Sequence, residues 1–356
     1  MIEPYYDCDG ITIYNADCRE VLPSIDAGSI NLICTDPPYF KVKNEWWDRQ
    51  WYKPEQFLNW IGELCEAWQR VLAFNGSLYV FASPQMAWGV EGEVRQWFNV
   101  LSSIRWIKDE GWHKRSSKEE LRGYFPNTET IIFAEQHGAD GNAMNGAGYT
   151  AKCDELRGFV FEPLRAYIVG EFERAGMLNQ AGKIAANVAC GFSASSGGMA
   201  SRHYFSTSQW CLPTESHYLA MRELLNGSGG DYLRREYEDL RREYEDLRRE
   251  YEDLRREYED LRRPFSATKE RPYTDVWEYP TVKPYKGKHP CEKPKQMMDH
   301  IVLTSSREGD TVLDCFGGSM RLAESCKEYG RKFVGIEVNE EYCEAAADRL
   351  AQGVLF

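Results

Sequence analysis

The sequence predicts an α/β protein whose mostly parallel sheet is built from two segments, separated by an inserted and mainly helical module. Short apolar runs alternate with helical patterns in residues 1–140 and again in residues 283–356. This alternation is typical of parallel strands joined by crossover helices. It stops in residues 141–282, where glycine- and serine-rich stretches and a seven-residue repeat replace it. We therefore expect one split domain with a different module inserted in it.

Five strands and one long helix are expected in the first block. The strands are the apolar runs GITIYNAD, SINLICTD, GSLYVFAS, LSSIRWIK and TETIIFAE. The helix is KPEQFLNWIGELCEAWQRVL, because apolar side chains return there at the spacing of one helix face, at Phe57, Ile61, Leu64, Trp68 and Val71. The closing block contains DTVLDCF, SMRLAESCKEYG, KFVGIEV and EEYCEAAADRLA, which we interpret as strand, helix, strand and helix.

The inserted module begins with a helical stretch, NQAGKIAANVACGF, followed by a turn region and a later helix that starts near Pro213 or Thr214. REYEDLR then occurs four times in succession, from Arg235 to Arg262. Tyr and Leu alternate there at spacings of three and four, which predicts a long helix over residues 231–263 with one apolar stripe. The stripe either packs on its own module or mediates self-association into a homodimer.

Composition limits the class of protein. With 356 residues and 42% apolar side chains, the chain can form a sizeable core. It has no apolar run of the roughly 18 residues that span a membrane, and MIEPYYDCDG lacks the features of a signal peptide. We therefore expect a cytoplasmic protein with no membrane partner. The 11 cysteines form no C-x-x-C pair and no zinc-type cluster, so no disulfide framework and no metal are expected.

Net charge is −13, which by itself disfavours a polyanionic partner. Binding of phosphates depends on local charge, however. The stretch KPYKGKHPCEKPK carries five lysines against the single acid Glu292. A nucleic acid therefore remains a reasonable partner.

The first motif is CTDPPYF, residues 34–40, which follows a buried strand. Asp36 is expected at the carboxyl edge of the sheet, where open α/β folds bind ligands. Pro37 and Pro38 keep the backbone extended, so helical hydrogen bonds do not use their carbonyl oxygens. With the ring of Tyr39, these groups suit a planar molecule that carries an NH₂ group. The simpler alternative is a proline turn with an incidental acid.

The second motif is VLDCFGGSMRLAE, residues 312–324, in which a strand leads through a glycine-rich turn into a helix. Gly317 and Gly318 are expected to let a ligand approach the backbone and the helix N-terminus. The next strand ends at Glu337, about twenty residues later, where an acid can bind the ribose hydroxyls of a nucleoside cofactor. The dehydrogenase sequence G-x-G-x-x-G is absent.

TDPPY, then HPCEKP and then DCFGGS resemble, in this permuted order, the motifs of the β-class amino-methyltransferases of DNA. The resemblance covers the two outer blocks, about two-thirds of the chain. It implies a Rossmann-like methyltransferase fold with a mostly parallel seven-stranded sheet, S-adenosylmethionine as the cofactor, and double-stranded DNA as the partner. It also implies a bacterial or phage-encoded protein.

The resemblance also assigns roles by position. The target-amine site is Asp36, Pro37, Pro38 and Tyr39. The cofactor site comprises Asp17, Cys18, His289, Lys293, Pro294, Asp314, Phe316, Gly317, Gly318, Ser319 and Glu337. In it, Asp17 would lie near the cofactor adenine, and the segment around Lys293 would line the methionine end. The chain departs from the family at Met320, where a glycine usually follows the serine.

The substrate implied is the exocyclic 6-amino group of adenine, because family members that act on cytosine more often have Ser in place of Asp36. The cytosine 4-amino group is the alternative. An aromatic amine is a poor nucleophile, and hydrogen bonds from it to Asp36 and the Pro37 carbonyl would free its lone pair. Since the amine lies inside the duplex, the base must flip out and stack on Tyr39. No covalent intermediate is needed.

The inserted module resembles the helix-turn-helix-like recognition segment of related methyltransferases. Five polar residues in it are suited to base or phosphate contacts: Arg202, His203, Ser206, Ser208 and Gln209. A polar surface loop is the alternative for this segment.

Two other functions remain open at this level. One is a methyltransferase for glutamine in proteins, whose tetrapeptide begins with Asn; Asp36 and the long insert argue against it. The other is a DNA-binding or scaffold protein with a decayed active site, which Met320 and the repeat suggest. Cofactor binding without turnover would support that last alternative.

Overall fold

The computed structural model describes residues 2–108, 124, 126–136, 149–227, 229–267, 274–285 and 288–351. The chain forms two compact units. The sheet unit comprises Met1–Ala139 and Arg263–Phe356, and the helical unit is Asp140–Arg262. The sequence placed the second boundary at residue 282, which is too late, because β7 (Val276–Glu278) pairs with the sheet and belongs to the sheet unit.

Nine strands form one mixed sheet in the described part of the sheet unit, in the order β1-β2-β9-β8-β3-β4-β6-β5-β7. Besides β7, they are β1 (Tyr6–Cys8), β2 (Ile11–Asn15), β3 (Ile30–Thr35), β4 (Leu72–Ala82), β5 (Phe98–Ile107), β6 (Thr128–Gln136), β8 (Thr311–Asp314) and β9 (Lys332–Glu337). The expected number of seven was wrong, because the three-residue strands β1 and β7 extend both edges and are too short to show a pattern in the sequence.

Strand pairing joins the two ends of the chain. The neighbouring pairs β2/β9, β9/β8, β8/β3 and β3/β4 are all parallel, whereas β1/β2, β4/β6 and β6/β5 are antiparallel. The late strands β8 and β9 thus lie between the early strands β2 and β3. Since the carboxyl ends of parallel strands meet at one edge, residues that follow β2, β3, β8 and β9 are brought together.

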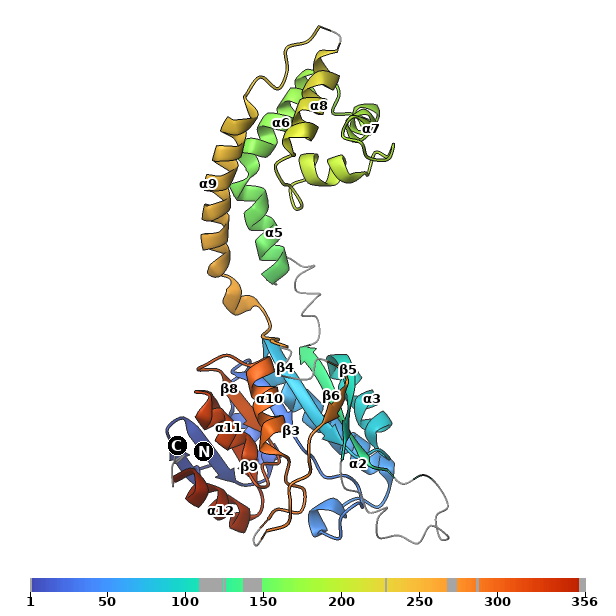
Figure 1. Ribbon diagram of the computed structural model, residues 1–356. Coiled ribbons are helices and arrows are strands. Elements are labelled where there is room, and N and C mark those ends of the chain that lie inside the picture. Colours follow the sequence, from blue (N-terminus) through green and yellow to red (C-terminus); the bar gives the residue numbers. More distant parts are fainter. Residues whose placement is uncertain are drawn as a thin grey trace. The chain divides into compact units, whose positions relative to one another are not determined.

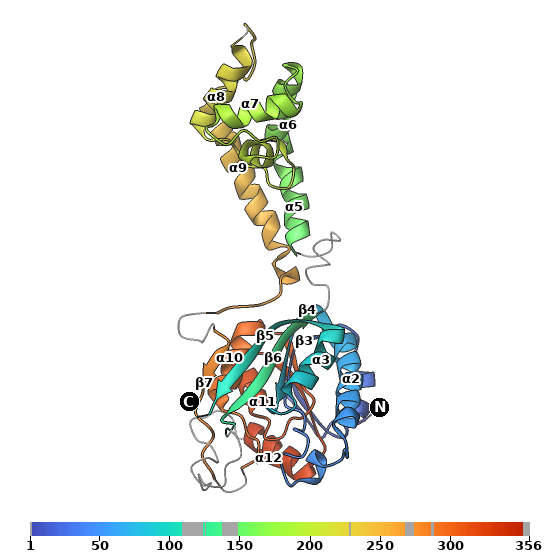
Figure 2. The same ribbon diagram turned by 90° about the vertical axis from the view of Figure 1, so that its right-hand side faces the viewer.

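Helices cover both faces of the sheet (Figures 1 and 2). One face is packed by α2 (Pro54–Val71) and α3 (Ala87–Trp97), which bury the apolar face that the sequence predicts for α2. The other is packed by α10 (Lys295–Ser305), α11 (Arg321–Glu328) and α12 (Glu340–Ala351). The short α1 (Cys18–Val21) follows β2. These two cores fix the strand ends that carry the site.

The helical unit contains α5 (Tyr149–Val160), α6 (Glu162–Arg174), α7 (Gln180–Ala189), a π-helical turn η5 (Ser201–Phe205), α8 (Glu215–Asn226) and α9 (Tyr237–Arg256). Thr214 caps α8, since its side chain accepts a hydrogen bond from the backbone N–H of His217. This confirms the predicted start of that helix. Among the described helices of the chain, none is long and apolar enough to cross a membrane.

The repeat forms a shorter helix than predicted. The regular helix α9 ends at Arg256, and only a short 3₁₀ turn, Glu259–Leu261, follows it. Its stripe packs inside the helical unit: Leu240 is fully buried, and the ring of Tyr251 lies 5.6 Å from that of Phe161. The structure thus shows the first of the two alternatives, in which the helix braces its own module. Self-association stays a prediction.

Candidate active site

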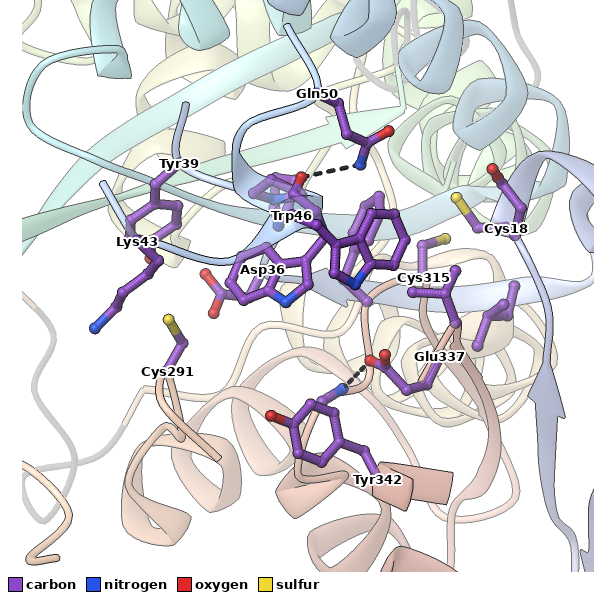
Figure 3. A pocket seen from close by; sticks show the side chains of 18 of the residues that line it. Cys18, Asp36, Tyr39, Lys43, Trp46, Gln50, Cys291, Cys315, Glu337 and Tyr342 are labelled. Atoms are coloured by element: carbon purple, nitrogen blue, oxygen red, sulfur yellow. Dashed lines mark hydrogen bonds between the residues drawn. The ribbon is translucent and has the colours of Figure 1, made fainter. Parts of the chain in front are cut away.

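A pocket with about 930 Å³ of empty space, part of it open to solvent, lies at the carboxyl ends of the parallel strands. Its wall includes Asp17 after β2, Asp36 after β3, Phe316 after β8 and Glu337 at the end of β9. Figure 3 shows Asp36 on the same side of the pocket as Cys291, whereas Glu337 lies toward the right-hand side of the view. The strand order thus brings together the two motifs that the sequence singled out.

A buried acid fixes the turn that carries the DPPY residues. The Asp48 side chain, fully buried, accepts hydrogen bonds from the backbone N–H of Tyr39 and of Lys43, both at 2.6 Å. Pro37 and Pro38 are also buried. Among the described residues, the Pro37 carbonyl oxygen accepts no hydrogen bond, so it is available to a ligand. The turn is therefore rigid and keeps a free acceptor.

Asp36 is bound on one side only. Its Oδ2 accepts a hydrogen bond from the ammonium of Lys293 at 2.5 Å. Its Oδ1 is shielded from solvent and has no hydrogen-bond partner in the described part of the chain. Burial raises the pKa of Asp36, an effect that the charge of Lys293 opposes. A buried acceptor without a partner costs free energy, so this oxygen favours the arrival of a donor.

Lys293 has contacts that the resemblance did not suggest. It lines a smaller adjoining hollow, and its buried ammonium also sits between two carboxylates, Asp36 and Glu129, with Glu129 Oε2 at 3.5 Å. The Tyr39 hydroxyl accepts from Lys293 at 3.2 Å and donates to Glu129 at 2.9 Å. Lys108 also pairs with Glu129. Tyr39 is thus held by its hydroxyl inside a charged network.

Glu337 is held by the backbone. Its Oε2 accepts from the N–H of Gly318 at 2.8 Å, and its Oε1 accepts from the N–H of Asn339 at 2.9 Å. Burial raises the pKa of Glu337. Each oxygen keeps a second lone pair, so a ligand hydroxyl can still donate to this carboxylate. This arrangement fits a ribose diol.

The glycine-rich turn serves the packing of the protein itself. A Cβ on Gly317 would lie 2.2 Å from the end of the Met320 side chain, and a Cβ on Gly318 would lie 2.9 Å from the His289 ring. Both glycines also line the hollows of the site, so the close approach of a ligand stays a prediction. Met320 has a left-handed backbone, with φ of 52°, and its side chain is fully buried. Its methyl-thioether packs beside Gly317 and Gly335, so the departure from the family pattern does not fill the pocket.

Asp17 and Asp314 have partners of their own. The Asp17 side chain caps α1 and pairs with Arg19 at 2.7 Å; the bond to Arg19 lowers the pKa of Asp17. Asp314 Oδ1 accepts from the Thr35 hydroxyl at 3.1 Å and from the Phe316 N–H at 3.0 Å. Burial raises the pKa of Asp314 to about 7. Asp314 thus joins the ends of β3 and β8.

The other predicted cofactor residues are distributed around the same region. Cys18 and His289 line the pocket, Ser319 lines a smaller adjoining hollow, and Pro294 is the N-cap of α10. Burial lowers the pKa of His289 to about 4, so its ring is neutral at pH 7. The ring stands edge-on to Tyr342 at 4.6 Å.

Sequence reasoning missed the aromatic wall and one acid. The pocket is also lined by Trp46, Trp47, Trp60 and Tyr342. Three tryptophans within KNEWWDRQW, just after DPPYF, were an available signal, because tryptophans in a polar segment often mark a ligand site. Glu129 gave no such signal, since it lies in a strand that reads as apolar.

A second hollow, with about 1100 Å³ of empty space that is partly open to solvent, is also lined by Tyr39. Four lysines are among the residues lining it: Lys43, Lys108, Lys288 and Lys293. Lys108 and Lys293 pair with acids, whereas the ammonium groups of Lys43 and Lys288 contact backbone carbonyl oxygens, of Pro290 and Val282. Two acids also line the hollow, but Glu129 pairs with Lys108 and Lys293, and Glu292 pairs with Arg321. The charges of Lys43 and Lys288 therefore remain for an anionic ligand.

The five predicted DNA contacts lie together in the helical unit. Arg202, Ser208 and Gln209 are exposed, and His203 Nδ1 lies 3.1 Å from the Gln209 carbonyl oxygen. The Ser206 hydroxyl donates to the carbonyl of Arg202. The exposed side chains are free to meet a partner, whereas Ser206 closes its own turn. Among the described residues, no group of three or more His, Cys, Asp or Glu forms a candidate metal site.

Comparison with known proteins adds an independent observation. The family model described as DNA methylase matches residues 30–348. The DNA adenine methyltransferase YhdJ of Escherichia coli K12 is 24% identical to the chain over 339 residues, 95% of this chain and 82% of that protein. The type II methyltransferase M2.DpnII of Streptococcus pneumoniae is 40% identical over 79 residues, which cover 21% of this chain and 30% of that relative.

Among solved structures, the PvuII DNA methyltransferase, described as cytosine-N4-specific, resembles the chain with a TM-score of 0.51. Its sequence identity is 12%, and the match covers 98% of this chain and 88% of that one. At this identity the likeness concerns the fold alone.

Proposed function

Because the chain belongs to the DNA methylase family, whose model matches residues 30–348, we propose that it methylates the exocyclic 6-amino group of adenine in duplex DNA. The observation that carries this proposal is the Asp36 carboxylate, with one oxygen tied and the other without a partner, next to a free Pro37 carbonyl. The full-length likeness to a DNA adenine methyltransferase supports the choice of base.

The pocket residues fit S-adenosylmethionine, the cofactor of this proposal. Glu337 would accept the ribose hydroxyls, since both its oxygens keep a lone pair beside their backbone bonds. Phe316 and Trp60, whose ring centroids lie 5.6 Å apart, offer apolar faces to the adenine ring. When bound, the cofactor supplies an electrophilic methyl group on a sulfonium.

The residues of the chain prepare the amine. Asp36 Oδ1 would accept one of its two hydrogens and the Pro37 carbonyl the other. Two such acceptors favour a tetrahedral nitrogen, so the lone pair leaves the ring and becomes nucleophilic. After transfer the nitrogen carries a positive charge and one surplus proton. The carboxylate of Asp36 can take that proton and pass it to water.

The target adenine would have to leave the base stack to reach Asp36, because the pocket is recessed at the sheet edge. Tyr39 is the expected stacking partner, and its hydroxyl is held by Glu129 and Lys293. The cationic hollow beside Tyr39 would receive the flanking phosphates. We assign sequence recognition to the helical unit, with Arg202, Ser208 and Gln209 as its exposed polar side chains.

The cytosine 4-amino group is the second candidate, because the same two acceptors suit any aromatic amine. Asp36 favours adenine. Expression in a host that lacks its own DNA methyltransferases, followed by sequencing that detects modified bases, separates the two. N6-methyladenine at one recurring sequence is expected. N4-methylcytosine would replace the proposed base, and unmodified DNA would contradict the function; the Asp36→Asn variant is the matched control.

A further inference from the structure

Lys293 is a charged side chain in a buried position, where loss of solvation disfavours its charge. Its side chain is 9% exposed, and those of its two acidic neighbours, Asp36 and Glu129, are 17% and 10% exposed. A charged ammonium is retained in such a place only if its partners repay its desolvation. Burial by itself would lower the pKa of Lys293, yet the charges of Asp36 and Glu129 outweigh that effect and raise it. Its two acidic neighbours therefore favour the charged form of Lys293.

The contacts of this cation divide the two oxygens of Asp36. Lys293 takes Oδ2 at 2.5 Å, which leaves Oδ1 without a partner in the described part of the chain. Its other contacts are the Tyr39 hydroxyl at 3.2 Å, the Cys291 carbonyl oxygen at 3.5 Å and Glu129 at 3.5 Å. One side chain thus contacts both the acid and the ring of the DPPY turn. An ammonium has three hydrogens, which match the three hydrogen bonds to Asp36, Tyr39 and Cys291, and Glu129 adds an ion pair.

We propose that Lys293 is a positioning residue for the target amine: it fixes Asp36 in its ionised form with Oδ1 free. This inference rests on the proposed function, because it names how the same site presents its acceptor. The cofactor-lining role that the resemblance implied for Lys293 stays a separate prediction.

The charges around Asp36 make the proposal specific. Ionisable groups from several elements face the pair formed by Asp36 and Lys293: Cys34, Tyr39, Lys108, Glu129, His289, Cys291 and Asp314. Lys293 favours the carboxylate form of Asp36, whereas Glu129 disfavours it. The two neighbours therefore act on the same acid with opposite sign.

The pH dependence of activity is set by the ionisation of Asp36. The reaction needs the carboxylate, so activity is lost as pH falls through the pKa of Asp36. Without the Lys293 charge this pKa rises, and the acid limb of kcat/KM for DNA moves to higher pH. Without the Glu129 charge the pKa falls, and the limb moves to lower pH. A lysine that served only to support the fold would lower activity equally at every pH.

The test measures kcat/KM for a duplex carrying the target sequence from pH 5 to 9 for wild type, Lys293→Met, Lys293→Arg and Glu129→Gln. At pH 7, Lys293→Met should lose on the order of 100-fold, as for a charge-assisted hydrogen bond. Lys293→Arg should recover part of that loss. Lys295→Met is the matched control: Lys295 lies two residues on and pairs with Asp299 and Glu328, outside the pocket.

Binding of S-adenosylmethionine to the same proteins separates the two roles considered for Lys293. A dissociation constant within about threefold of wild type in Lys293→Met supports the inference, whereas a loss matching the loss of rate overturns it. If Lys293→Met does not fold, the Glu129→Gln limb decides, because a shift to higher pH or no shift also overturns the inference. A wild-type protein that leaves DNA unmethylated would refute the proposed function instead.

Discussion

Two carboxylates on the wall of one pocket, Asp36 and Glu337, are held in different ways. Backbone N–H groups, those of Gly318 and Asn339, occupy one lone pair on each oxygen of Glu337. Asp36 is held by a single charged side chain, Lys293, and one of its oxygens is left without a partner in the described structure. The fold thus fixes the orientation of Glu337, whereas charge sets the state of Asp36.

This difference suits the two acids to different tasks: Glu337 to binding the cofactor, and Asp36 to acting on the target amine. A carboxylate fixed by the backbone has the same shape before and after a ligand arrives, which suits selective binding of hydroxyls. A carboxylate tuned by a buried cation can favour a transient charge on an amine and accept its proton. Burial raises the pKa of both acids, so their neighbours and not their depth distinguish them.

Replacing Asp36 should give the largest effect. Asp36→Asn keeps the shape but removes the charge, so methyl transfer should fall by at least about 1000-fold while S-adenosylmethionine binds within a few-fold of wild type. Single-turnover methylation and calorimetric cofactor titration measure the two quantities. Asp26→Asn, at an exposed acid of the same unit, is the control. Equal losses of binding and rate would erase the distinction between the two acids.

Glu337→Gln should give the reverse pattern. The amide replaces one acceptor with a donor, so one backbone N–H and the ligand hydroxyls lose hydrogen bonds, and cofactor affinity should fall about 10- to 100-fold. Calorimetry measures this change, with the exposed Glu340→Gln as control. An unchanged dissociation constant would remove Glu337 from the cofactor site.

The lysines beside Tyr39 should give a smaller effect, on DNA alone. Lys288→Gln removes a cation whose only described contact is a backbone carbonyl, so KM for DNA should rise about two- to fivefold, and the slope of log KM against log salt should weaken by about one. Lys295→Gln, from the same lysine-rich segment, should leave both unchanged because its partners are Asp299 and Glu328. Equal effects in the two variants would contradict a phosphate contact at Lys288.

Met320 should have the smallest effect on the site. Its side chain is buried away from the pocket, so Met320→Ala should leave cofactor affinity within about twofold while lowering the free energy of unfolding by about 2–5 kcal/mol. Thermal or denaturant unfolding and cofactor titration of the same protein measure both. A large loss of affinity with unchanged stability would show that the turn, and not Glu337, limits binding.

Much of the fold follows from the sequence. The strands and helices that the apolar periodicity predicts are present, because core positions on α2 such as Ile61 and Trp68 dictate one buried face. The edge strands β1 and β7 have only three residues each and leave no such pattern. The repeat has four identical units, yet Leu240 is fully buried and Leu254 only partly. Because the four units have the same sequence, the repeat alone cannot show where α9 ends. The end depends on which residues pack against each unit.

The sequence predicts the two acids on the pocket wall, Asp36 and Glu337. It does not predict the side chains that form ion pairs around Asp36. Asp36 and Glu337 follow apolar strands in recognisable motifs, so strand order places both at one edge. The ion pair of Asp36 with Lys293 joins residues 257 positions apart, and nothing local shows which carboxylate the lysine meets. Glu129 is harder still, because it is a buried acid within a strand and is explained only by Lys108, Lys293 and Tyr39 around it.

The most direct test of the division between the two acids is the single-turnover rate of methyl transfer to duplex DNA at saturating S-adenosylmethionine, measured for Asp36→Asn and Glu337→Gln side by side. Saturation removes a defect of binding but not a defect in activating the amine. The account predicts that Glu337→Gln returns to within a few-fold of the wild-type rate, while Asp36→Asn stays at least about 1000-fold slower. Recovery of Asp36→Asn at high cofactor, or a Glu337→Gln rate that remains as low as that of Asp36→Asn, would contradict it.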